Sequence, residues 1–87
     1  MKKYFVYVLR SKFDGKFYTG FTSDLDKRII DHNSGKVIST RKRIPFELVY
    51  YEFGLNLDDA VHREKYLKTT YGKRFIKQRL KNYLAIK

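Results

Sequence analysis

Five side chains in this sequence have types suited to proton transfer or phosphate chemistry. They are Tyr7, Tyr18, Arg28, His32 and Glu64. Tyrosine and histidine can accept or pass on a proton, and arginine presents a planar fork of donors that matches phosphate oxygens. A single carboxylate can hold a divalent cation that keeps several of its waters. Whether the five act together depends on the elements that position them.

The first two strands are predicted from two aromatic and β-branched segments. Residues 4–9 read Tyr-Phe-Val-Tyr-Val-Leu, and residues 16–21 read Lys-Phe-Tyr-Thr-Gly-Phe. The dipeptide Asp14-Gly15 between them is a strong turn signal. We therefore expect a hairpin whose first strand is buried on both faces.

Tyr7 and Tyr18 are expected on the same face of this hairpin. A two-residue loop places Tyr7 opposite Thr22, and a four-residue loop places it opposite Gly20, but the parity of the pairing is the same in both cases. Gly20 has no side chain and is expected to leave open space beside the two phenols. Two ordinary core tyrosines are the alternative.

A first helix is expected to end near Asn33, with caps offered by residues 22–24, a capping box from Ser23 to Asp26 and a stop at Gly35. Its apolar side is formed by Leu25, Ile29 and Ile30.

Arg28 and His32 are four residues apart on that helix and share a face beside the apolar side. They are either an ordinary surface pair or a phosphate clamp with a proton-transfer group.

The remaining elements follow a basic loop that ends at Pro45. Residues 46–51 predict a third strand, Asn56 caps a second helix that ends near Gly72, and a third helix covers about residues 73–83. The order ββαβαα predicts an α+β fold, a small three-stranded antiparallel sheet flanked by helices, in a single domain over residues 1–87.

Glu64 lies in the middle of the buried side of the expected second helix. Its neighbours on the helical wheel are Leu57, Ala60, Val61, Leu67, Lys68 and Tyr71. A buried carboxylate needs a partner. The candidates are Lys68 one turn on, another basic group, or a divalent cation, for which one carboxylate with open positions suits Mg²⁺. His32 and His62 are too isolated to indicate zinc.

The composition limits the classes of function. The formal net charge is +11 in 87 residues, and there is no cysteine, which excludes disulfides, thiolate zinc sites and a cysteine nucleophile. The longest apolar run, residues 4–9, is too short for a membrane span. We expect a soluble, cytoplasmic protein with no membrane partner. The basic residues cluster at residues 63–87 and at 41–43, which favours nucleic acid over a merely solvated surface.

Taken together, these residues resemble the GIY-YIG endonuclease superfamily, in particular its small single-domain bacterial members. Phe5-Val6-Tyr7 stands in the place of the GIY triplet and Tyr18-Thr19-Gly20 in the place of YIG. Arg28 follows Tyr18 by ten residues, His32 lies one turn later, and Glu64 matches the family's metal-binding glutamate.

The resemblance implies a DNA endonuclease that uses one Mg²⁺ or Mn²⁺ ion held by Glu64. Tyr7 would be the general base, and Tyr18 would position or assist. Arg28 would stabilise the transition state, and His32 would hydrogen-bond Tyr18 or the phosphate. Free tyrosine titrates near pH ~10, so a nearby cation such as Arg28 must lower the pKa of Tyr7 for this role.

The chain departs from the family pattern at two places, of which the second bears on activity. The first triplet keeps only its tyrosine, and Gln78 replaces an asparagine that many members carry on the last helix, with Asn82 as an alternative. The expected phosphate or DNA contacts are Gly20, Arg41, Lys42, Arg43, Lys68 and Gln78.

The expected partner is DNA, branched or single-stranded, with a role in DNA repair and with a partner protein for targeting. The competing functions are a catalytically weak or inactive nucleic-acid-binding module and a small basic protein of a ribosome-like assembly.

Overall fold

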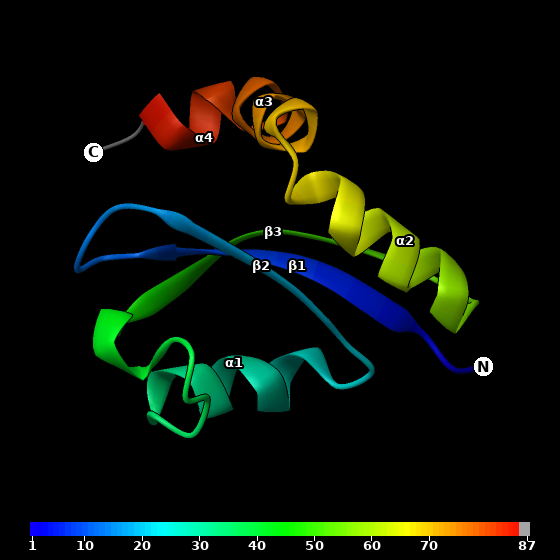
Figure 1. Ribbon diagram of the computed structural model, residues 1–87, viewed down its shortest axis with the longest axis horizontal. Coiled ribbons are helices and arrows are strands. Elements are labelled where there is room, and N and C mark those ends of the chain that lie inside the picture. Colours follow the sequence, from blue (N-terminus) through cyan, green and yellow to red (C-terminus); the bar gives the residue numbers. More distant parts are fainter. Residues whose placement is uncertain (86–87) are drawn as a thin grey trace.

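Three antiparallel strands form the centre of the fold (Figure 1). The computed structural model describes residues 1–85. The strands are β1 (Tyr4–Ser11), β2 (Phe17–Thr22) and β3 (Phe46–Gly54), and their order in the sheet is β2-β1-β3. The central strand β1 is therefore covered on both sides by a neighbour, whereas β2 and β3 form the two edges. The α+β prediction and the antiparallel sheet are confirmed.

The β1–β2 hairpin uses the four-residue loop. Leu9 pairs with Tyr18 and Tyr7 pairs with Gly20, and the Ser11 N–H donates to the Lys16 carbonyl (2.9 Å), which closes a loop of residues 12–15. Gly15 has φ +74°, a left-handed conformation that glycine adopts without strain. Tyr7 and Tyr18 consequently lie on the same face of the sheet, as predicted.

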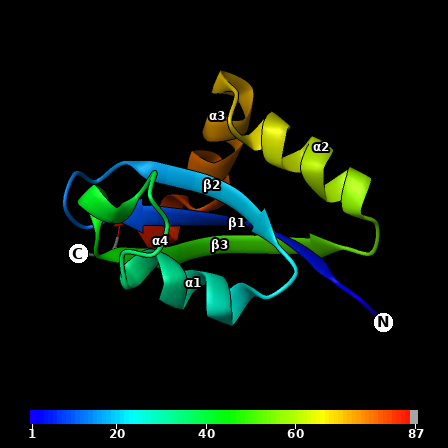
Figure 2. The same cartoon turned by 60° about the horizontal axis from the view of Figure 1, so that its bottom comes forward.

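The helices divide between the two faces of the sheet (Figures 1 and 2). Helix α1 (Leu25–Asn33) covers one face. Helices α2 (Leu57–Leu67) and α3 (Thr70–Arg79) cover the other, and the short α4 (Lys81–Ala85) follows α3. A single 3₁₀ turn, Arg41–Arg43, lies between α1 and β3.

Helix α1 begins at one of the predicted caps, but without the predicted capping box. Asp24 is the N-cap, and its side chain accepts a hydrogen bond from the Lys27 N–H, so the expected capping box from Ser23 does not form. Ile30 is 64% exposed, so its assignment to the apolar side was wrong. The helix ends at Asn33, as expected, and Gly35 follows with φ +78°.

The second helix was predicted too long. It starts after its Asn56 cap as expected, but it ends at Leu67, and α3 already starts at Thr70. The Thr69 hydroxyl forms the corner because it donates to the Tyr66 carbonyl (2.6 Å) and accepts from the Gly72 N–H (3.1 Å). Gly72 packs directly against the last backbone turn of α2, where a Cβ would overlap the Tyr66 carbonyl. A glycine that the sequence suggested as a helix end is thus the contact between two helices.

Each face of the sheet has its own core. The core beneath α2 and α3 consists of buried aliphatic residues: Val6, Val8, Val49, Ala60, Leu67 and Ile76. The core beneath α1 contains Tyr7, Leu9 and Phe46, with Tyr18, Leu25, Ile29, Ile44 and Leu48 packed against them. Of the helices within residues 1–85, none has the length and apolar character needed to cross a membrane.

Candidate functional site

Tyr7 lies in the α1 face of the sheet with its phenol over Gly20 on the edge strand β2. Its side chain is 1% exposed. A Cβ at position 20 would lie 2.5 Å from the Tyr7 hydroxyl oxygen, Oη. The expectation of open space at Gly20 was therefore wrong, because the phenol of Tyr7 fills that space. The absence of a side chain at Gly20 is what lets the hydroxyl reach the edge of the sheet.

His32 is the hydrogen-bond partner of Tyr7. Its ring is fully buried, with Nε2 2.8 Å from Tyr7 Oη and Nδ1 2.8 Å from Thr40 Oγ1. The ring of Tyr18 meets the imidazole edge-on, with centroids 5.0 Å apart. His32 thus bonds to Tyr7 and not to Tyr18, which corrects the expectation, and the surface-pair alternative is wrong for this residue.

Arg28 approaches the same phenol from α1. Its Nε–H donates to Tyr7 Oη at 3.4 Å, and the side chain is half-buried. Because the Tyr7 oxygen accepts from Arg28, its own proton is free to go to His32 Nε2. The Thr40 hydroxyl has the Val37 carbonyl as an acceptor at 3.4 Å, so its oxygen can accept from His32 Nδ1–H. This assignment satisfies every member of the chain and leaves Nε2 as the proton acceptor.

The titration of the pair is controlled mainly by burial. Burial raises the pKa of Tyr7, and the Arg28 guanidinium opposes that rise without cancelling it. Burial, followed by the charge of Arg28, lowers the pKa of His32 to about 4. The expected net lowering of the Tyr7 pKa is therefore not found. Near neutral pH the hydroxyl of Tyr7 is therefore protonated and the imidazole of His32 is neutral. The hydrogen bond between Oη and Nε2 contains one proton, which is carried by Tyr7.

Glu64 lies on the opposite face of the sheet from Tyr7 and His32. It lies on α2, and its carboxylate is 13% exposed and 3.0 Å from Lys68 Nζ. Of the partners proposed for Glu64, the salt bridge with Lys68 is the one present. The charge of Glu64 contributes to the raised pKa of Tyr7, although it is the smallest of the contributions. The two residues therefore interact electrostatically.

The single carboxylate of Glu64 suits a hydrated divalent ion. No three His, Cys, Asp or Glu side chains gather into a cluster anywhere in residues 1–85, so an all-protein cage is not available there. A single carboxylate, supplemented by water and by phosphate oxygens, is a common way in which proteins bind Mg²⁺. Lys68 is 51% exposed on a flexible stem and can swing away from the carboxylate.

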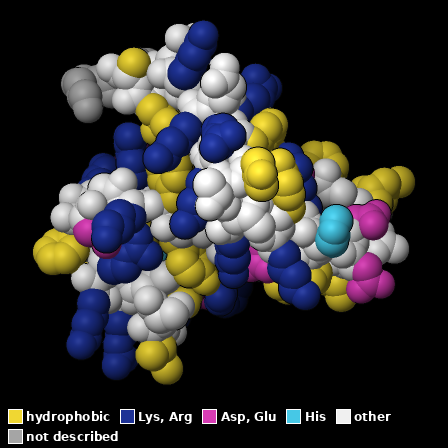
Figure 3. Space-filling model, turned by 45° about the horizontal axis from the view of Figure 1, so that its top comes forward, with side chains coloured by type: hydrophobic (Ala, Val, Ile, Leu, Met, Phe, Trp, Pro, Cys, Tyr) yellow, Lys and Arg dark blue, Asp and Glu magenta, His cyan; other side chains and the backbone are white. Residues whose placement is uncertain are grey.

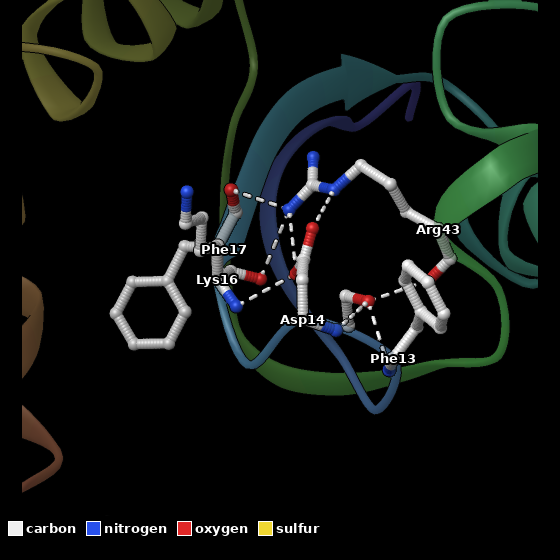
Figure 4. Close-up of polar contacts among 6 residues, drawn as sticks. Phe13, Asp14, Lys16, Phe17 and Arg43 are labelled. Atoms are coloured by element: carbon white, nitrogen blue, oxygen red, sulfur yellow. Dashed lines mark hydrogen bonds and ion pairs between the residues drawn. The ribbon is translucent and has the colours of Figure 1, made fainter.

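The three basic residues before Pro45 divide into two kinds. Arg41 and Lys42 are exposed, as expected for phosphate contacts. Arg43 is held against the hairpin: its Nε–H donates to Asp14 Oδ2 (2.7 Å) and its Nη2 to the Lys16 carbonyl (3.2 Å) (Figure 4). Its guanidinium lowers the pKa of Asp14 to about 2. Arg43 therefore ties the loop to the hairpin, and the phosphate contact expected of it is not supported.

Gln78 lies on the exposed side of α3. It lines a hollow with Thr70, Lys73, Arg74, Lys77 and Lys81. It makes no hydrogen bond with Tyr7 or His32, and Asn82 on α4 is likewise exposed. The position expected to assist at the phosphate is therefore separate from the tyrosine–histidine pair.

Thr40 is the residue that the sequence reasoning did not place in the site. It is fully buried and holds Nδ1 of His32. Its neighbours in the sequence are the basic residues of the loop, so it looks like one more surface hydroxyl. No periodicity marks a buried residue in an irregular segment, and only the fold brings it to His32.

Comparisons with known proteins show the family of the chain. The GIY-YIG catalytic domain family matches residues 3–82. A UPF0213 protein of Staphylococcus saprophyticus is 41% identical over 70 residues, covering 79% of this chain and 84% of that protein. A UPF0213 protein of Clostridium perfringens is 48% identical over 65 residues, covering 74% and 69% respectively.

A solved structure is also similar. The solution NMR structure of a UPF0213 protein from Bacillus halodurans has a TM-score of 0.54 and 38% sequence identity, and the match covers 85% of this chain and 81% of that one. The family match spans nearly the whole chain and includes the two tyrosines, Arg28, His32 and Glu64. The chain therefore belongs to the GIY-YIG nuclease superfamily.

Proposed function

We propose that this protein is a metal-dependent endonuclease that hydrolyses phosphodiester bonds in DNA. The observation that carries the proposal is the buried hydrogen bond from Tyr7 to His32, with Arg28 on the same phenol oxygen. Such a chain of donors and acceptors has a clear use in proton transfer, and it lies in a domain of a nuclease superfamily. The net charge of +11 favours a polyanionic substrate.

Tyr7 is the general base in this proposal. The attacking water gives a proton to Tyr7 Oη as the phenol passes its own proton to His32 Nε2. The water oxygen bonds to phosphorus, and the bond from phosphorus to the leaving oxygen breaks; the leaving oxygen takes its proton from solvent. Since burial raises the pKa of Tyr7, a free phenolate is scarce, and the transfer to His32 lets the phenol act without one.

Arg28 stabilises the developing negative charge. Only its Nε–H is engaged, with Tyr7, among the described residues, so its terminal N–H groups are available to phosphate oxygens. Its hydrogen bond to Tyr7 raises the pKa of the guanidinium, which therefore stays charged. A preorganised donor of this kind typically contributes about 10²–10³ to turnover.

Glu64 would hold the divalent ion, with Lys68 released from its ion pair. When bound, the ion would act as a Lewis acid on the phosphate and neutralise part of its charge. Tyr18, on the edge strand β2, lies beside His32 and lines a hollow together with Lys68, the ion-pair partner of Glu64. It would position the substrate phosphate there.

The test is cleavage of branched, nicked and single-stranded DNA in the presence of Mg²⁺ or Mn²⁺. The variants Glu64→Gln and Arg28→Lys are compared with Asp58→Asn, which removes an exposed charge from the first turn of the same helix as Glu64. We expect Asp58→Asn to cut normally, Glu64→Gln to be inactive, and Arg28→Lys to lose about 10²–10³ in turnover because lysine lacks the planar fork. Normal cutting by Glu64→Gln would contradict the mechanism.

A binding module that does not cut is the second candidate. The observations that favour it are the ion pair that occupies Glu64 and the raised pKa of Tyr7. It predicts DNA binding with no cleavage of any substrate under any divalent ion. It also predicts that Glu64→Gln leaves DNA affinity unchanged.

A further inference from the structure

A groove runs along the surface between α3 and the hairpin end of the sheet. It consists of three adjoining hollows of about 450, 210 and 580 Å³. Lys73 lines all three, and Lys77 and Phe17 each line two. The hollow of about 210 Å³ is also lined by Tyr18 and Lys68. This surface, which we call the α3 groove, therefore begins at the candidate site and leads away from it.

Three cations of the α3 groove are not neutralised by the protein, whereas Lys68 is paired with Glu64. Lys16, Lys73 and Lys77 are exposed, and none of them forms an ion pair with another residue in the range 1–85. Lysine and arginine side chains gather over α3 and the hairpin end of the molecule (Figure 3). Arg43 at the rim is different, because Asp14 holds it in place. The three lysines are thus available to an external anion.

The floor of the α3 groove is apolar and aromatic. Phe17 is half-buried, and its ring projects away from the Arg43–Asp14 pair (Figure 4). Val8, Leu67 and Ile76 continue the apolar lining. Free phosphate or another small anion would make no use of such a floor. A planar base, in contrast, can stack on an aromatic ring while its phosphate contacts a lysine.

We propose that the α3 groove binds a single-stranded segment of DNA that leads to the scissile phosphate. The phosphates would lie along Lys16, Lys73 and Lys77, and a base would contact Phe17. This inference rests on the proposed endonuclease function, and it narrows the substrate to DNA with a single-stranded segment beside the cleaved bond.

The chemistry of the groove favours a single strand over a duplex. In a duplex the bases stack on one another and present only their edges, so no base face is available to Phe17. Rows of cations combined with an aromatic platform are the usual means of binding single strands without sequence preference. The end of the groove at Tyr18 and Lys68 would then deliver the strand to the residues that cut it.

Binding can be separated from cleavage by fluorescence anisotropy in EDTA. The probe is a labelled oligothymidylate of about 12 nucleotides, compared with a duplex of the same length and an oligouridylate. The groove variant Lys73→Gln/Lys77→Gln removes two charges from exposed helical positions. The control Lys2→Gln/Lys36→Gln removes two charges from exposed residues that line none of the three hollows.

We expect the groove variant to lose about tenfold or more in affinity for the single strand. Its slope of log affinity against log salt should fall by about 0.7 for each lost phosphate contact, whereas the control retains most of its affinity. Phe17→Leu should lose about fivefold or more through stacking, with the melting temperature measured alongside because Phe17 also packs on the core.

The inference fails if the groove variant binds the single strand as well as the control does. Equal weakening toward duplex and single strand would contradict the single-strand assignment, and tighter binding of the oligouridylate would replace DNA with RNA. These outcomes are independent of cleavage: a protein that binds through the groove but never cuts would refute the endonuclease alone. A protein that cuts normally without using the groove would refute only this inference.

Discussion

The two faces of the sheet bury different kinds of side chain. Beneath α2 and α3 the buried residues are aliphatic. Beneath α1 the buried residues include a tyrosine, a histidine and a threonine joined by hydrogen bonds of 2.8 Å. Every buried polar side-chain atom found in residues 1–85 has a partner, so the polar face is fully satisfied. One face is organised for packing, and the other holds a chain of hydrogen-bonded polar side chains in place.

The polar face carries a free-energy cost that the aliphatic face does not. Placing His32 in the interior depresses its pKa and requires a partner on each ring nitrogen. An aliphatic side chain would need neither. The same sheet carries both faces because alternate residues of β1 point in opposite directions: Val6 and Val8 to one core, Tyr7 and Leu9 to the other.

The largest expected effect is on the free energy of unfolding. It differs between two glycines, one of which packs on each face of the sheet. Gly72→Ala drives a Cβ into the backbone of α2 on the aliphatic side, and we expect a loss of about 3 kcal/mol or more in the free energy of unfolding. Gly20→Ala displaces the Tyr7 phenol and should cost about 1–3 kcal/mol. Denaturant titration measures both, with Gly54→Ala as the control because nothing lies within 4 Å of its added Cβ.

Cleavage assays on the same variants sharpen the contrast. Gly20→Ala should be inactive even where it is fully folded, while Gly72→Ala should cut at temperatures at which it remains folded. Gly20→Ala with wild-type turnover would show that the position of the phenol does not matter.

The next effect is the pH dependence of stability caused by His32. Its pKa is lowered to about 4 in the folded protein, against about 6.5 when unfolded, so the unfolded chain binds the extra proton between these values. The stabilisation that comes from keeping His32 neutral is therefore fully present above pH ~6.5. As the pH falls toward 4, the free energy of unfolding decreases by on the order of 2 kcal/mol. Urea titrations from about pH 7 to 5 measure the slope.

His32→Gln should flatten that slope, because glutamine does not titrate. The control is His62→Gln at an exposed histidine on α2, which should leave the slope in place. An equal slope in wild type and His32→Gln would mean that His32 is not held neutral by the fold.

A smaller effect tests Thr40. Thr40→Val keeps the shape of the side chain but leaves His32 Nδ1–H without an acceptor, which should cost about 1–2 kcal/mol. Thr40→Ser restores the hydroxyl and should recover most of the loss. In the ¹⁵N spectrum of the imidazole, wild type and Thr40→Ser should show the proton on Nδ1. An unchanged tautomer in Thr40→Val would remove Thr40 from the proton-transfer chain.

Local patterns in the sequence are sufficient for much of this architecture. The aromatic and β-branched run at residues 4–9 and the Asp14-Gly15 turn predict the hairpin, and the parity of the strand pairing places Tyr7 and Tyr18 on one face. The Asn56 cap marks the start of α2. The end of α2 was missed because Thr69 and Gly72 form a corner through tertiary packing, and a glycine inside a helical pattern is equally typical of a helix end.

The site was only partly predictable for the same reason. Spacing indicates which residues could act, but not which atoms meet. That His32 bonds to Tyr7, that Thr40 holds the other nitrogen, and that Asp14 pins Arg43 all depend on segments brought together by the sheet. Burial also decides the direction of the Tyr7 pKa, and no local pattern measures how deeply a side chain is buried.

The role of the Tyr7 hydroxyl in cleavage is tested most directly by removing one hydroxyl from each face of the sheet. Tyr7→Phe keeps the ring over Gly20 but removes the oxygen that His32 and Arg28 contact, whereas Tyr50→Phe removes a hydroxyl that bonds to Glu52 on β3. Turnover of branched DNA with Mg²⁺ is measured for both folded variants. We expect Tyr50→Phe to cut within about twofold of wild type and Tyr7→Phe to lose at least about 10²-fold. Cleavage by Tyr7→Phe at the rate of Tyr50→Phe would contradict that role of the Tyr7 hydroxyl.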